Sequence, residues 1–115
     1  MKDEPLFSQI INDIIIERDN ERVIAWIPDN SNPSKYKILW DNYYEGMKYF
    51  SFENEKILQI VHEDNSLSYI DIDTGIILSK FYRLWKGWHA VYGDGLLYMS
   101  GSNTLYSIKP NTEWE

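Results

Sequence analysis

The sequence contains no cysteine. A disulfide framework is therefore excluded, and so is any zinc site that needs thiolate ligands. Long apolar runs are also missing, since no stretch approaches the roughly 20 apolar residues of a membrane-spanning helix. Residues 1–5 place two acids and a proline where a secretory signal would place basic and then apolar residues. We therefore expect a cytoplasmic protein that does not engage a membrane.

Basic residues are scarce, with 11 Lys and Arg against 18 Asp and Glu, for a net charge of −7. An acidic surface repels phosphate groups, so we expect no direct binding to nucleic acid. The charge is uneven, because residues 1–75 hold 15 acids and 7 bases whereas residues 76–112 hold one acid and 4 bases. Such a distribution either serves solubility alone or steers the protein toward a basic partner.

The 115 residues fit one domain, residues 1–115, and their pattern is that of strands. Short apolar and β-branched runs alternate with clusters of Asn, Asp, Gly and Ser, which form turns. We predict an all-β, antiparallel fold. Its strands span roughly residues 14–18, 22–27, 35–40, 49–53, 56–62, 67–72, 77–82, 89–92, 96–100 and 104–109. Residues 5–13 are ambiguous, because their apolar residues have helical spacing and favour a short N-terminal helix as the alternative to a strand.

The chain contains an internal repeat. Shifted by 38 positions, residues 57–75 lie over residues 95–113 without a gap. The turn around Asn65 then meets the turn around Asn103, and Leu67 meets Leu105. Residues 20–27 resemble residues 54–61 more faintly, 34 positions apart. The sequence therefore predicts about three degenerate strand-turn-strand repeats.

Residues 67–75 and 96–112 resemble the β-propeller blades of quinoprotein-like and WD40-like proteins. The resemblance implies blade architecture. It does not carry over a cofactor, since Ser79 stands where quinoprotein repeats place a tryptophan and Glu113 replaces the repeat glycine. About three blades are too few for a ring, which usually needs four to eight. We therefore expect an open half-propeller or curved sheet stack with unpaired edges, through which two copies could form a homodimer.

No constellation of residues points to catalysis or to a metal. His62 and His89 are the only histidines, and a lone histidine in a strand is usually structural. Asp71, Asp73 and Gly75 faintly resemble a calcium loop, but Tyr82 stands where the loop needs a glutamate. Nucleophile-elbow, phosphate-loop and dinucleotide motifs are absent. We expect neither an enzyme nor a bound cofactor or metal.

Two aromatic segments, residues 40–46 and 84–88, lie between predicted strands. Their rings either wedge between sheets or form an interaction surface, where Trp and Tyr are common anchors. Small, acidic, cysteine-free proteins of this kind are similar in character to bacterial immunity proteins, which neutralise basic nuclease toxins. On that hypothesis the partner-binding residues are Asp41, Tyr43, Tyr44, Glu45, Glu63, Asp64, Asp71, Asp73, Trp85 and Trp88.

Two other functions remain open. Exposed Trp and Tyr rings can stack on sugars, as in a module that binds carbohydrate or another small ligand. Open sheet edges can also assemble copies of one chain into a scaffold. The salt dependence of binding distinguishes the inhibitor from the sugar-binding module. Association with a basic partner slows as ionic strength rises, whereas the stacking of rings on sugars changes little.

Overall fold

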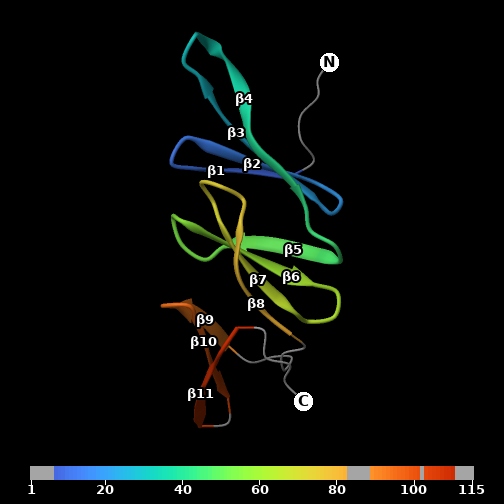
Figure 1. Ribbon diagram of the computed structural model, residues 1–115, viewed down its shortest axis with the longest axis vertical. Coiled ribbons are helices and arrows are strands. Elements are labelled where there is room, and N and C mark those ends of the chain that lie inside the picture. The colour runs from blue at the N-terminus through green and yellow to red at the C-terminus, as the bar shows by residue number, and fades with distance from the viewer. Residues whose placement is uncertain (1–6, 83–88, 102, 111–115) are drawn as a thin grey trace.

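The computed structural model describes residues 7–82, 89–101 and 103–110, and this part of the chain holds strands and turns but no helix (Figure 1). The strands form three antiparallel sheets, none of them closed on itself. The first sheet has the order β1 (Phe7–Ile11), β2 (Ile14–Asp19), β3 (Arg22–Asp29) and β4 (Asn32–Tyr43). The second has the order β5 (Met47–Phe52), β6 (Ile57–His62), β7 (Leu67–Asp71) and β8 (Ile77–Phe81). The third has the order β11 (Thr104–Ile108), β10 (Leu96–Gly101) and β9 (His89–Gly93).

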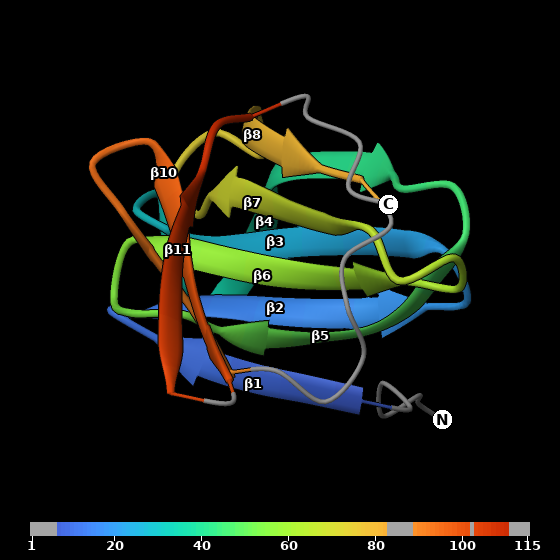
Figure 2. The same cartoon turned by 90° about the horizontal axis from the view of Figure 1, so that it is seen from below.

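The three sheets stack along the long axis of a molecule that measures 52 × 25 × 21 Å (Figure 1). Strands of the first two sheets run in similar directions, whereas β10 and β11 cross them (Figure 2). The predicted all-β, open and antiparallel stack is confirmed. Each four-stranded sheet is a simple meander, which is also the arrangement within a propeller blade.

The ambiguous N-terminal segment forms a strand, β1, where the helical spacing had suggested a short helix. Ile10 pairs with Ile15 and Ile11 pairs with Ile14 across a hairpin. Its two turn residues, Asn12 and Asp13, have φ values of 49° and 66°. Asn and Asp tolerate this left-handed backbone better than most residues. The segment therefore forms a strand and not a helix, because β2 supplies a strand with which β1 can pair.

Two clusters of buried side chains join the three sheets, and β7 contributes to both. Ile70 belongs to the cluster between the first and second sheets, and Leu67 and Tyr69 belong to the cluster that involves the third. This alternation along β7 agrees with the faces predicted from the sequence. In the second cluster the Tyr69 ring stacks on Tyr92, with centroids 4.2 Å apart, and meets Phe81 edge-on.

The 38-residue repeat corresponds to equivalent hairpins. It sets the β6–β7 hairpin over the β10–β11 hairpin, and the equivalent turn residues Asn65 and Asn103 have φ values of 71° and 65°. The fainter 34-residue match does not join equivalent strands of two sheets. It sets β3, the third strand of its sheet, over β6, the second strand of the next. That similarity reflects common turn chemistry followed by an apolar strand rather than equivalent positions in a blade.

The segment predicted as an aromatic loop, residues 40–46, belongs largely to β4. Trp40 is buried, and its Nε1 donates a hydrogen bond of 2.7 Å to the carbonyl of Ile72. This bond and the surrounding contacts dock β4 on the β7–β8 turn of the next sheet. The other predicted loop, residues 84–88, lies outside the described residues.

Candidate functional site

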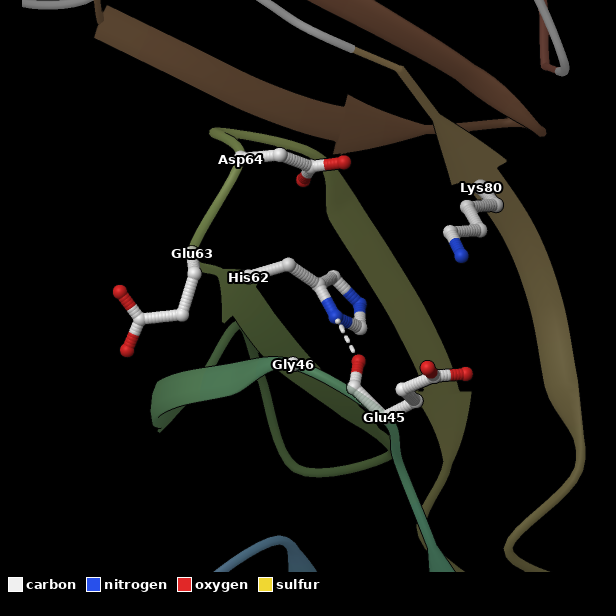
Figure 3. Close-up of a pocket in the computed structure, with 6 residues that line it drawn as sticks. All are labelled: Glu45, Gly46, His62, Glu63, Asp64 and Lys80. Carbon is white, nitrogen blue, oxygen red and sulfur yellow. Dashed lines mark hydrogen bonds between the residues drawn. The ribbon is translucent and has the colours of Figure 1, made fainter.

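A cleft of about 330 Å³ opens where the β4–β5 connection meets the β6–β7 turn and β8. Its lining residues carry three carboxylates, one ammonium group and one imidazole. They are Glu45, Gly46, His62, Glu63, Asp64 and Lys80. Figure 3 shows the His62 ring between Glu45 and Asp64, with the Glu63 side chain directed away from Lys80.

His62 is buried, and both of its ring nitrogens have partners. Nδ1 lies 2.9 Å from the carbonyl oxygen of Glu45. Because a carbonyl only accepts, Nδ1 carries the proton and Nε2 accepts from the Ser68 hydroxyl at 2.7 Å. Burial lowers the pKa of His62, and the Lys80 charge lowers it further, against opposing contributions from the Glu45 carbonyl and Asp64. The ring is therefore neutral at pH 7.

The contact between Ser68 and His62 has the spacing of a nucleophile and its base. Ser68 has no solvent-exposed surface, however, so its hydroxyl cannot reach a substrate in solution. The pair instead ties β7 to the last residue of β6, and through Nδ1 to the β4–β5 connection. This arrangement agrees with the structural role expected for a lone strand histidine.

Glu21 extends the site toward the first sheet. Its carboxylate accepts hydrogen bonds from the Tyr43 hydroxyl and, at 2.7 Å, from the backbone N–H of Gly46. Both hydrogen bonds lower the pKa of Glu21, and the bond from Tyr43 has the larger effect. Tyr43 in turn has a raised pKa because its hydroxyl faces this carboxylate. We call the resulting set of residues the acidic rim: Glu21, Tyr43, Glu45, Glu63 and Asp64.

Four of the residues predicted from the sequence therefore come together in the acidic rim. Asp41 lies nearby, but Arg22 engages it in a bidentate pair with N···O distances of 2.8 and 2.5 Å. This pairing lowers the pKa of Asp41 and offsets its charge. Tyr44 is buried, and its hydroxyl donates to the Gly75 carbonyl at 2.8 Å. It packs between sheets and is not available as the surface anchor that was expected.

The remaining predicted residues do not join the rim. Asp71 ends β7 whereas Asp64 precedes it, so the two carboxylates lie at opposite ends of a strand roughly 13 Å long. Asp71 accepts a hydrogen bond of 2.9 Å from the backbone of Asp73, which is turn chemistry. Trp85 and Trp88 lie outside the described residues.

Sequence reasoning missed Glu21 and Lys80 as members of this site. Glu21 gave no signal of its own, because its partners Tyr43 and Gly46 are more than twenty positions away and meet it only through the pairing of β3 with β4. Within the described residues, no group of three or more metal-ligating side chains occurs, and no helix is long and apolar enough to cross a membrane.

Comparisons with known proteins found similarity to solved structures but not to a family model or a curated protein. BamB from Moraxella catarrhalis is 16% identical over 89% of this chain and 32% of its own length, with a TM-score of 0.49. A chain from an S. cerevisiae complex of Dbp5, Nup159, Gle1, IP6 and ADP is 13% identical over 92% of this chain and 31% of its own, with a TM-score of 0.48. The chain thus spans about a third of the length of each similar structure.

Proposed function

We propose that this chain is a non-enzymatic, cytoplasmic inhibitor that binds a basic protein, of the kind formed by a nuclease toxin and its immunity protein. The observation that carries the proposal is the convergence of Glu45, Glu63 and Asp64 on one cleft from two separate connections. A nuclease active site is basic because it binds phosphates. Carboxylates on a rigid support are attracted by the same positive potential.

The charge of the cleft supports this choice of partner. Its three carboxylates outweigh the one ammonium group of Lys80, and His62 is neutral, so the lining side chains sum to −2. In the described part of the chain, the exposed carboxylates of Glu45 and Glu63 have no ion-pair partner. They remain available to a cationic surface, whereas Asp41 is already paired with Arg22.

The acidic rim is held in place by backbone contacts. The N–H of Glu63 donates to the Gly46 carbonyl at 2.7 Å, and His62 bonds to the Glu45 carbonyl. The N–H of Gly46 bonds in turn to Glu21. Binding would therefore cost little ordering of the main chain, which favours affinity.

Tyr43 adds an apolar contact beside these charges. Its side chain is 66% exposed although its hydroxyl is bonded to Glu21. A tyrosine fixed in this way offers contact area without a large loss of rotamer freedom on binding. Tyrosine is enriched at protein interfaces, where polar groups commonly surround the aromatic contacts.

The test is binding to the product of the gene immediately upstream, where a toxin paired with an immunity protein would be encoded. Surface plasmon resonance at about 50 and about 300 mM NaCl should show association that slows strongly with salt. The double variant Glu45→Gln/Glu63→Gln should slow association by roughly three- to tenfold at low salt.

The control variant Asp13→Asn/Glu55→Gln changes the net charge equally in turns away from the cleft, and it should leave the association rate near that of the wild type. If the two variants slowed association equally, the acidic rim would have no specific part in binding. Absence of binding, or binding without salt dependence, would contradict the proposed function.

A further inference from the structure

The two end sheets of the stack each have one face that turns away from the second sheet (Figure 1). In proteins built from stacked repeats, the terminal repeats need a polar outer face to stay soluble. Neither end sheet has such a face over its described residues. Both outer faces instead carry apolar side chains, and the strand register defines which side chains these are.

An apolar row crosses the outer face of the first sheet. Directly paired residues project from the same face of a sheet. The register pairs one residue of each strand in turn, from β1 to β4: Ile10, Ile15, Trp26 and Ile38. None of the four belongs to the buried cluster between the first and second sheets. Ile10 is 71% exposed and Ile38 is 49% exposed. We call this row the first end face.

The third sheet has a comparable outer face. Tyr98 of β10 pairs with Val91, and Ser100 pairs with Leu105, with no register shift in either ladder. None of these residues belongs to the buried cluster, whereas Leu97, which points to the opposite face, does. Val91 is 59% exposed and Leu105 is 69% exposed. We call Val91, Tyr98 and Leu105 the second end face.

Charged side chains beside the first end face give it a negative balance. Glu17 lies on this face, because its carboxylate accepts a hydrogen bond of 2.8 Å from Nε1 of Trp26. Asp41 stands in the same row of the register as Glu17. Arg22 bonds to Asp41 and pairs in the sheet with Asp19. Three carboxylates against one guanidinium group sum to −2.

The second end face carries no such excess. The strands β9, β10 and β11 contain no Asp or Glu, and beside them the charge of Asp94 is offset by that of Lys109. Contact of the first end face with its own copy would therefore bring together two faces of charge −2. Contact with the second end face opposes no like charges, which favours it as the partner.

We infer that copies of this chain associate head to tail, with the first end face of one copy packed on the second end face of another. This contact continues between copies the packing of sheet on sheet that the chain makes twice within itself. One kind of contact then covers both of the apolar end faces. Such a contact is heterologous, and it forms a ring when its rotation closes and a longer stack when it does not.

The size of the end faces predicts a weak contact. Across its long axis the molecule measures 25 × 21 Å. Each end face therefore covers at most about 500 Å², and a contact buries about 1,000 Å² in total, at the lower limit for a specific interface. We expect an affinity in the micromolar range or weaker. No residue of either end face lines the cleft beside His62, so this inference does not depend on the proposed function.

Sedimentation velocity of the full chain from about 5 to about 500 µM should show association that increases with concentration. Ile38→Lys places a charge in the first end face, and Leu105→Lys places one in the second. Each variant alone should weaken association by roughly tenfold or more, because the contact would bury an unpaired charge. Ile77→Lys, on the second sheet, is the matched control because Ile77 is 48% exposed, and it should associate like the wild type.

Mixing the two end-face variants tests the direction of the contact. In an equimolar mixture the Leu105→Lys copy still offers its first end face and the Ile38→Lys copy its second. Pairs of one copy of each should therefore form, which misfolded chains could not do.

Four results would overturn the inference. The wild type could stay monomeric at about 500 µM, or the mixture could fail to associate. Ile77→Lys could weaken association as much as Ile38→Lys does. Finally, Leu105→Lys alone could associate like the wild type while Ile38→Lys does not, which would mean that the first end face pairs with itself.

Discussion

Gly75 lies at the contact between the first two sheets, and its substitution by alanine gives a sharp test of that contact. The residue has a φ of 76°, in the left-handed region. A Cβ atom added there would lie 2.6 Å from Cδ2 of Trp40 and 2.7 Å from Nδ2 of Asn42. The Gly75 carbonyl also accepts hydrogen bonds from Asn42 and Tyr44, both at 2.8 Å.

The expected loss has two parts. Left-handed backbone costs an alanine about 1–2 kcal/mol relative to glycine. Overpacking against the buried Trp40 ring adds about 1–3 kcal/mol, because the neighbouring groups cannot all move aside. Gly75→Ala should therefore lower the free energy of unfolding by about 2–5 kcal/mol.

Gly95 provides the matched control. Its φ is 78°, but a Cβ atom there would meet nothing within 4 Å. Gly95→Ala should cost only the backbone part, about 1–2 kcal/mol. Urea unfolding followed by circular dichroism measures both values. If the two variants lose equal stability, the close approach of Gly75 to Trp40 does not exist in solution and the docking of the first two sheets is wrong.

Two further predictions concern the cleft and the second core. Because the folded state lowers the pKa of His62 from 6.5, the unfolded state takes up the proton first. The free energy of unfolding should fall as pH drops below about 6.5, by at most about 1.4 kcal/mol per pH unit from this residue, and His62→Gln should flatten this part of the profile in urea titrations. Tyr92→Leu removes the ring stacked on Tyr69 and the hydroxyl contact of 2.8 Å with Ser79. It should cost about 1–3 kcal/mol in the same assay, and unchanged stability would contradict the packing of the third sheet.

Much of the fold could be predicted from the sequence because its strands carry local signals. Asn65 and Asn103 mark tight hairpins, and both have the positive φ that their turns require. Alternation along β7 separated the two faces correctly, since Tyr69 and Ile70 lie in different clusters. The exception was β1, where Ile10, Ile11 and Ile14 fit a helix as well as a hairpin. Only pairing with β2 decides between them.

The site could be predicted only in part. Glu63 and Asp64 form one turn, but their proximity to Glu45 depends on how the β4–β5 connection meets the β6–β7 turn. Asp71 was grouped with the others because of its charge, although the predicted strand over residues 67–72 already separates it from Asp64. Composition does not separate a buried aromatic such as Tyr44 from an exposed one.

The central structural claim is that the second sheet packs on both faces and holds the other two. Ser68, Tyr69 and Ile70 of β7 have no exposed surface, whereas Ile10 of β1 is 71% exposed. Amide hydrogen exchange measured residue by residue by NMR tests this directly, since protection follows local opening. The amides of β7 should exchange most slowly and those of β1 among the fastest. Fast exchange throughout β7, with slower exchange in β1, would contradict the stacked arrangement.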